Sequence, residues 1–278
     1  MDERSVERAA ERYRLLMPRA ALTGRVGNLS SAQVGSSLEL HDFREYQPGD
    51  DLRHIDWNAV ARTGRPILRV RREEGAPRVE ILVDASRSMA ISLRKRERAR
   101  ELSQLFARIG RAQCLTPVVF WLSDSPRRLE GGSPPPADFE GRRPLGELLP
   151  HLTLRTCGVR ILVSDLLFEG GLAPIFRRLA DGAARLSLVQ VLDPEDEEPT
   201  GGEGARLVDS ESGAALDRLL TWDVLARYRQ RLAAHLRVID AEARKVRAVL
   251  CRVDAGEALE ASVRGRLTGS LVEPRARA

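Results

Sequence analysis

Residues 79–88 read VEILVDASRS, and this stretch decides the fold. Four of its first five residues are apolar and lead straight to Asp84, which is typical of a strand buried on both faces. Similar apolar runs follow, with apolar residues at helical spacing between them. The predicted strands cover 117–122, 159–163, 186–192 and 249–253, and the predicted helices cover 95–111, 172–180 and 222–246. This alternation predicts a mixed α/β class, with a doubly wound, mostly parallel sheet.

The remaining patterns divide the chain into three parts. Residues 1–74 form an N-terminal extension, with an amphipathic helix predicted over 3–22. Residues 75–258 hold the α/β domain, in which residues 127–130 form a short edge strand and the expected strand order is 3-2-1-4-5-6. Residues 259–278 are expected to be a loose C-terminal tail.

Composition narrows the class of protein. The 278 residues include 45 basic and 40 acidic side chains, and hydrophobic residues make up 42%, which excludes disorder for most of the chain. Only two of the basic residues are lysines, Lys95 and Lys245. No apolar stretch reaches the roughly 18 residues of a membrane span, and the N-terminus does not resemble a secretory signal. We therefore expect a cytoplasmic protein.

Oxygen-bearing side chains gather where two strands end. Asp84 ends the first regular strand, Ser86 and Ser88 follow it at alternating positions, and Asp165 follows the strand over 159–163. In the expected order these strands are neighbours, so the side chains converge on one crevice. Hard oxygen donors are the ligands that Mg²⁺ or Mn²⁺ prefers. Alternatively, Asp84 and the serines only cap the helix that follows.

This arrangement resembles the von Willebrand factor A fold and its metal-ion-dependent adhesion site. The resemblance covers about residues 78–254; Asp84, Ser86 and Ser88 match the first motif and Asp165 the last. It implies a divalent cation whose open coordination position accepts a carboxylate from a partner protein. The threonine of the middle motif has no counterpart here, so the implied site is incomplete.

A second informative stretch covers residues 39–65 and is dense in Arg, Asp, His and aromatic residues. Pro48 and Gly49 predict a turn. Ile55 and Trp57 are expected to anchor the stretch in the core. Such a composition suits a catalytic site, but it equally suits a scaffold in which Arg–Asp pairs fix loops, and we favour the scaffold.

As a string, this stretch is similar to the signature of the bacterial family called domain of unknown function 58. The signature residues in register are Arg44, Tyr46, Pro48, Gly49, Asp50, Asp51, Arg53, Asp56, Trp57, Arg62 and Gly64. The resemblance implies a protein with an A-type domain that works beside a MoxR-type AAA+ ATPase and other A-domain proteins, in complex maturation or stress response. It implies no chemical reaction.

Three functions remain open. The favoured one is a non-enzymatic protein-interaction adaptor that uses the incomplete adhesion site. The first alternative is a metal-dependent hydrolase centred on residues 41–56, with His41 and His54 as candidate bases. The second is nucleic-acid binding through arginine-rich runs at 69–72 and 94–96, which are more often solvated faces. No Gly-x-Ser-x-Gly elbow or Gly-x-x-x-x-Gly-Lys loop is present in the sequence.

Overall fold

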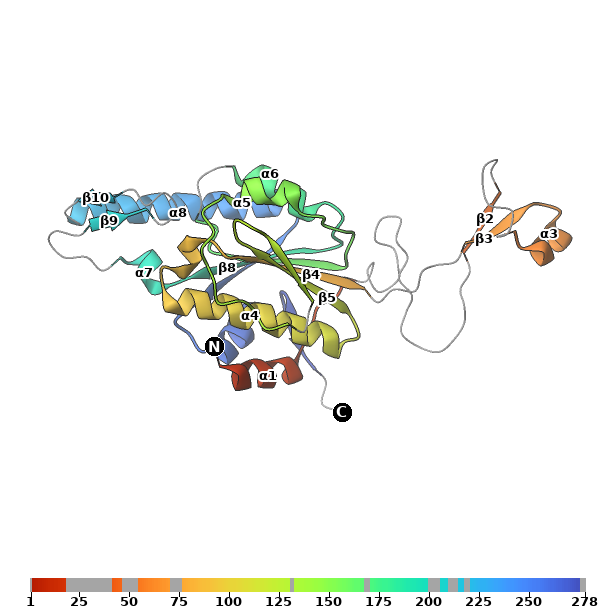
Figure 1. Cartoon of the computed structure of the whole chain (residues 1–278), viewed down its shortest axis with the longest axis horizontal. Helices are drawn as coiled ribbons and strands as arrows, with labels where there is room; N and C mark the ends of the chain where they lie inside the picture. The colour runs from red at the N-terminus through yellow and green to blue at the C-terminus, as the bar shows by residue number, and fades with distance from the viewer. Residues whose placement is uncertain are drawn as a thin grey trace.

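A six-stranded sheet forms the centre of the protein in the computed structural model (Figure 1). The structure describes residues 2–18, 42–46, 55–70, 77–130, 133–167, 171–199, 206–209, 215–217 and 221–275. The strands, in order across the sheet, are β6 (Arg127–Glu130), β5 (Thr116–Leu122), β4 (Arg78–Asp84), β7 (Val159–Ser164), β8 (Leu186–Leu192) and β11 (Val249–Asp254). Numbered along the chain, this order is 3-2-1-4-5-6. Only β6 pairs antiparallel with its neighbour, which confirms a mixed α/β class with a mostly parallel sheet.

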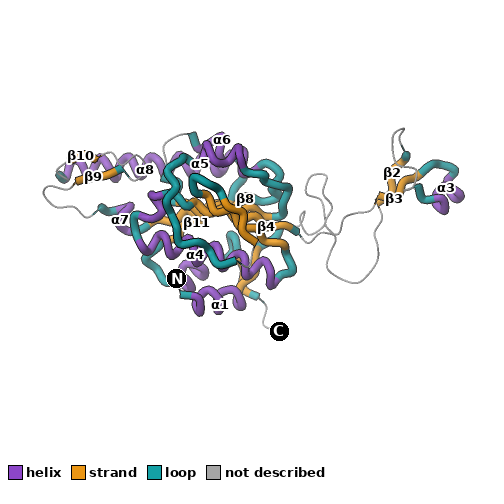
Figure 2. Tube along the Cα trace, viewed as in Figure 1, coloured by secondary structure: helices purple, strands orange, loops and turns teal. Residues whose placement is uncertain are grey.

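Helices cover both faces of this sheet (Figure 2). One face carries α1 (Glu3–Arg12) and α4 (Leu93–Ala112), and the other carries α5 (Leu145–Leu148), α6 (Leu172–Ala180) and α8 (Trp222–Lys245). Every residue of β7 and β8 is buried as a result. Two separate apolar clusters, one on each face, form the core. Parallel strands covered on both faces read as continuous apolar runs, which is why the sequence pattern identified them.

The first helix is shorter than expected. It ends at Arg12, and Tyr13–Leu15 form strand β1, which pairs antiparallel with β12 (Val272–Pro274). The helix predicted over 3–22 was therefore wrong beyond Arg12, and residues 19–22 lie outside the described residues. Leu15 fitted the apolar spacing of a helix because its side chain is buried. The structure buries it from strand β1 and not from a helix.

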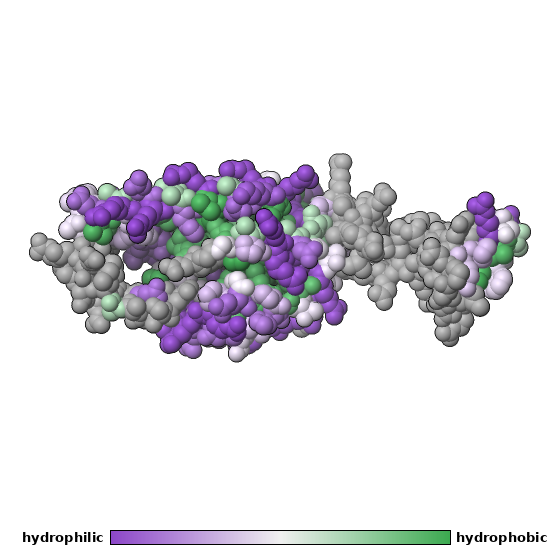
Figure 3. Space-filling view, turned by 90° about the horizontal axis from the view of Figure 1, so that it is seen from above, coloured by the Kyte–Doolittle hydropathy of each residue, from purple (hydrophilic) through white to green (hydrophobic). Residues whose placement is uncertain are grey.

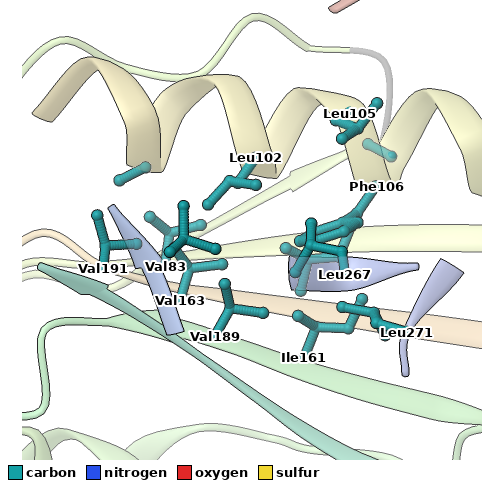
Figure 4. Close-up of a cluster of buried hydrophobic side chains, with 14 of the residues drawn as sticks. Val83, Leu102, Leu105, Phe106, Ile161, Val163, Val189, Val191, Leu267 and Leu271 are labelled. Atoms are coloured by element: carbon teal, nitrogen blue, oxygen red, sulfur yellow. The ribbon is translucent and has the colours of Figure 1, made fainter. Parts of the chain in front are cut away.

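The end of the chain is packed, so the expectation of a loose tail was wrong. Residues 259–275 form α9 (Leu259–Ser262), the π-helical turn η4 (Val263–Leu267) and β12. Figure 4 shows Leu267 and Leu271 in one cluster with Leu102 and Phe106 of α4. Apolar residues recur every fourth position at 259, 263, 267 and 271, and burying them against α4 outweighs the entropy of a free end.

The signature stretch forms a small unit of its own. Strands β2 (Asp42–Glu45) and β3 (Ile67–Val70) pair antiparallel, and α3 (Trp57–Thr63) packs against β3. Figure 1 draws this unit apart from the central sheet. The Trp57 side chain is 68% exposed and Ile55 is half-buried, so the expectation that they anchor the stretch in the core was wrong for Trp57.

Smaller elements complete the architecture. The short helices are the 3₁₀ turns η2 (Arg87–Ala90) and η3 (Leu149–His151) and the single turn α7 (Pro194–Glu197), and a hairpin pairs β9 (Arg206–Val208) with β10 (Ala215–Asp217). Figure 3 shows one face of the molecule, on which hydrophilic side chains surround smaller hydrophobic areas. Among the described helices, none combines the length and apolar character needed to cross a membrane.

Candidate functional site

The candidate site lies at the carboxyl ends of β4 and β7, at the left of the sheet in Figure 1, close to η2, α7 and the start of α4. Asp84 ends β4 and Asp165 directly follows β7, the neighbouring strand. We call the group formed by Asp84, Ser86, Ser88, Lys95, Asp165 and Asp196 the carboxyl-end cluster. Ligands of doubly wound proteins bind at this end of the sheet.

Asp84 and the two serines form the first half of the cluster. Both oxygens of the buried Asp84 carboxylate accept hydrogen bonds: Oδ1 from the backbone N–H of Ser86 at 3.0 Å and Oδ2 from the hydroxyl of Ser164 at 2.6 Å. The hydroxyls of Ser86 and Ser88 lie 2.9 Å apart and share a hydrogen bond. The alternating Asp-x-Ser-x-Ser pattern therefore places its three oxygen groups on one side of the loop, as expected.

The electrostatics of Asp84 differ from those of an exposed carboxylate. Burial raises the pKa of Asp84, and the nearby carboxylate of Asp165 raises it further, against the hydrogen bonds from Ser164 and Ser86. The ends of β4 and β7 thus lie close enough for the charges of Asp84 and Asp165 to interact. A buried carboxyl group with a raised pKa is typical of functional sites, because folding alone does not favour it.

Lys95 forms the second half of the cluster together with two aspartates. Its side chain is only 1% exposed, and its Nζ atom lies 2.9 Å from Oδ2 of Asp165 and 3.0 Å from Oδ2 of Asp196. Burial lowers the pKa of Lys95, but the two carboxylates outweigh burial and the net shift is upward, so the side chain is an ammonium. The expectation that residues 94–96 form a solvated basic face is therefore wrong for Lys95.

The loop after β7 holds Asp165 in place. Its Oδ1 accepts a hydrogen bond from the N–H of Leu167 at 3.1 Å, and its backbone oxygen accepts one from the Gln190 side chain at 2.8 Å. Leu166 adopts a φ of +56°, in the left-handed region that non-glycine residues avoid, and a ring nitrogen of His235 lies 2.6 Å from its carbonyl oxygen. Such strain is maintained only where neighbouring contacts fix the loop.

A glycine brings a second loop close to the serines. The N–H of Arg87 donates to the carbonyl of Gly141 at 2.9 Å, and the N–H of Gly141 donates to the carbonyl of Ala85 at 3.1 Å. A Cβ atom at position 141 would lie 3.1 Å from that Ala85 oxygen and 3.2 Å from Cα of Ser123. Backbone from residue 141 therefore borders the loop that carries Ser86 and Ser88.

The opposite ends of the same two strands hold a different charged group, the amino-end ion pair of Glu80 and Arg160. These residues are direct partners in the β4–β7 register, and both side chains are fully buried. Arg160 donates from Nε and Nη2 to Oε2 of Glu80 and also to three backbone carbonyls, and Oε1 of Glu80 accepts from Arg78 and from the N–H of Arg155. Two guanidiniums thus face the carboxylate of Glu80, and both of its oxygens accept hydrogen bonds.

The residues of the carboxyl-end cluster do not fit a divalent cation as they are arranged. Each oxygen of Asp84 and of Asp165 already accepts a hydrogen bond, and the two serine hydroxyls bond to each other. A cation bound to Oδ2 of Asp165 would face the ammonium of Lys95 at close range. Within the described ranges, no three His, Cys, Asp or Glu side chains are grouped to hold a metal ion.

The structure covers the signature residues only in part. His41, Pro48, Gly49, Asp50, Asp51, Arg53 and His54 lie outside the described residues. Arg44 lies in β2 opposite Leu68, and the N–H of Tyr46 donates to the carbonyl of Pro66. Oδ1 of the buried Asp56 accepts from the N–H of Ala59 and so caps α3, Arg62 is exposed, and Gly64 has a φ of +68° after the helix. The role of the signature stretch as a scaffold stays a prediction.

Sequence analysis missed three residues of the site: Ser164, Lys95 and Asp196. Ser164 could have been found, because it stands directly before Asp165 on the strand next to Asp84. Lys95 carried a weaker signal, as one of two lysines in an arginine-rich chain. Asp196 carried none, because nothing in the acidic loop indicates which of its carboxylates turns inward.

Comparisons with known proteins give one family and several distant structures. Among curated proteins there is no match. BatB from Bacteroides thetaiotaomicron, described as a conserved hypothetical protein, is 15% identical, with a TM-score of 0.38 over 68% of this chain and 95% of its own. An aerotolerance-related membrane protein from Bacteroides fragilis NCTC 9343, solved with multiple mutations to serines, is 13% identical, with a TM-score of 0.33 over 61% of this chain and 100% of its own.

The family model described as "Protein of unknown function DUF58" matches residues 42–112. The matched segment runs from β2 through α3, β3 and β4 to the end of α4, so it contains the signature stretch, the Asp-x-Ser-x-Ser loop and Lys95. Over these residues, the chain is similar to the family of proteins of unknown function DUF58.

Proposed function

We propose that this protein is a non-enzymatic adaptor that binds a partner protein through the carboxyl end of its central sheet. The site is a degenerate form of the adhesion site of von Willebrand factor A-like domains. The resemblance to the domain of unknown function 58 family favours a MoxR-type AAA+ ATPase as the partner, in protein complex maturation or stress response.

The convergence of Asp84, Ser86, Ser88 and Asp165 at the ends of two central strands carries this proposal. Exposed apolar side chains lie on the segment that leads from these residues into α4. Ile91 is 66% exposed and Leu93 is 58% exposed. Apolar groups beside a polar site suit contact with another protein, because interfaces combine an apolar centre with a polar rim.

An adaptor needs only a binding surface at this site, whereas an enzyme also needs an acid, a base or a nucleophile that can reach a substrate. Neither described histidine forms a hydrogen bond or ion pair with a side chain of the cluster: His151 is exposed after α5, and the ring of His235 contacts the carbonyl of Leu166. The carboxylates of the cluster are occupied by internal hydrogen bonds rather than aimed at an open cavity. The observations thus support recognition over acid–base or nucleophilic catalysis.

A binding assay with a purified MoxR-type AAA+ ATPase tests the proposal. We expect Ile91→Ser to weaken the affinity by about 10-fold, the effect of losing roughly 1.4 kcal/mol at a well-packed interface residue. Val238→Ser is the matched control, since Val238 is an exposed apolar residue on α8. Equal affinities for Ile91→Ser and Val238→Ser would contradict the proposal.

Two further assays test the alternatives. Hydrolysis of generic phosphoesters with Mg²⁺ or Mn²⁺, lost in Asp51→Ala, would favour the hydrolase. DNA binding that weakens steeply as salt increases would favour the nucleic-acid binder, since such binding releases counterions.

A further inference from the structure

We propose that the ammonium of Lys95 is the built-in cation of the carboxyl-end cluster, and that the site therefore keeps its geometry without a divalent metal ion. It follows that partner binding does not depend on metal ions, and this part rests on the proposed function. The stability of the cluster without metal does not rest on it.

The position of Lys95 is that of a bridging cation. Its Nζ atom contacts one oxygen from the loop after β7 and one from α7, at 2.9 and 3.0 Å, while its backbone belongs to the first turn of α4. Three segments that are distant in the sequence thus meet at one positive charge. A metal ion held by carboxylates would connect the same segments in the same way.

The charge of the cluster requires a cation at this place. Asp165 and Asp196 both contact Lys95, the carboxylate of Asp165 also interacts with that of Asp84, and Asp84 and Asp165 are almost fully buried. Buried carboxylates need a partner of opposite charge, and an ammonium is a compact point charge that fits between two oxygens from different directions. Nearly all other basic residues of this chain are arginines. The guanidinium group of arginine is planar and pairs best with both oxygens of one carboxylate.

Neighbouring contacts fix the two partners of Lys95. Oδ2 of Asp196, the same atom that contacts Lys95, accepts a hydrogen bond from the N–H of Asp193 at 2.9 Å. The hydroxyl of Ser92, which caps α4, donates to Oδ2 of Asp193 at 2.7 Å. The start of α4 and the start of α7 are therefore joined by this hydrogen bond and by ion pairs of Arg94 and Lys95, and the ammonium of Lys95 is the buried cation among them.

The test uses the full-length chain and compares Lys95→Met with Lys245→Met. Methionine keeps most of the length and apolar stem of lysine but removes the charge. Lys245 is the only other lysine of the chain; its side chain is 66% exposed and contacts Glu242, so Lys245→Met is a matched control. Each protein is titrated calorimetrically with MgCl₂ and with MnCl₂, and its Tm is measured with either salt and with EDTA.

We expect wild type and Lys245→Met to show no saturable binding of Mg²⁺ or Mn²⁺ and the same Tm in metal and in EDTA. Lys95→Met should have a lower Tm in EDTA and recover part of the loss with metal, since a ligand that binds the folded state raises its stability. Saturable metal binding by wild type that Asp84→Ala abolishes would overturn the proposal. A Tm of Lys95→Met that is the same with metal and with EDTA would also overturn it.

A second variant covers the case in which Lys95→Met does not fold. Adding Asp165→Asn removes one unpaired carboxylate, so the double variant should be more stable than the single one. A double variant no more stable than Lys95→Met would contradict the pairing.

Partner binding separates this inference from the proposed function. We expect the affinity of wild type for the ATPase to be the same in EDTA and in Mg²⁺ when the nucleotide state of the ATPase is held constant. Loss of binding in EDTA with an intact ATPase would overturn the inference and leave the adaptor function standing. Conversely, if Ile91→Ser leaves binding unchanged, the adaptor proposal fails while the metal titrations still decide the role of Lys95.

Discussion

The two ends of strands β4 and β7 carry buried charges of different kinds. At the amino ends, the carboxylate of Glu80 faces two guanidiniums, those of Arg160 and Arg78. At the carboxyl ends, the carboxylates of Asp165 and Asp196 share the ammonium of Lys95, and the pKa of Asp84 is raised by burial and by Asp165. A buried carboxylate in direct contact with cations fixes strand register, whereas carboxyl groups that outnumber the cations beside them add a cost that stability alone does not explain. The comparison is consistent with our proposal that the carboxyl end is the functional one.

The largest expected effect is at the amino end. Arg160→Met should lower the free energy of unfolding by about 3–5 kcal/mol, because it leaves the carboxylate of Glu80 buried without its main partner. Denaturant unfolding measures this change. The double variant Arg160→Met with Glu80→Gln should recover part of the loss; a double variant as unstable as the single one would show that the pair acts through packing alone.

A change of opposite sign is expected at the carboxyl end. The folded protein holds the proton of Asp84 more tightly than the unfolded chain, whose Asp pKa is about 3.8. The cost of ionising Asp84 is therefore absent below pH 3.8 and grows as the pH rises toward the raised pKa of the folded state. Asp84→Asn should raise the free energy of unfolding at neutral pH by on the order of 1 kcal/mol, a usual size for one substitution.

Unfolding measured at several pH values tests this prediction, with Asp124→Asn as the control. Backbone hydrogen bonds from Arg142 and Arg143 lower the pKa of Asp124, so its carboxylate contributes stability above the ordinary Asp pKa that is lost as the pH falls. Asp124→Asn should therefore lower stability at neutral pH. The same sign of effect for both variants would refute the contrast.

The smallest effect on the free energy of unfolding is expected at an exposed ion pair, which serves as the reference for the buried ones. Nε of Arg14 lies 2.8 Å from Oε1 of Glu273 between β1 and β12, and both side chains are well exposed. Arg14→Gln should change the free energy of unfolding by about 0–1 kcal/mol, since exposed pairs gain little. A loss comparable to that of Arg160→Met would mean that burial does not distinguish the two kinds of pair.

Much of the fold could be predicted from the sequence, because its signals are local. The apolar runs of β4, β7 and β8 stand out since both faces of these strands are buried. The ends of the chain were harder. Leu15 fits a helical pattern, but its backbone pairs with a strand more than 250 residues away, and no local pattern reports such a partner. Trp57 was expected in the core because it is a large aromatic residue. The sequence does not show what surrounds it, and the structure leaves it exposed.

By itself, the sequence determined where the strands lie along the chain and placed Asp84, Ser86, Ser88 and Asp165 at strand ends, because periodicity depends on neighbouring residues. The strand order was expected from the common doubly wound arrangement and not from any local pattern. Only the tertiary structure decided which charge faces them. Lys95 reaches Asp165 across 70 residues of chain, and this contact depends on how α4 lies on the sheet and how far its first turn extends past the strand ends. Electrostatic partners are chosen by distance in space, which a linear pattern of residue types does not contain.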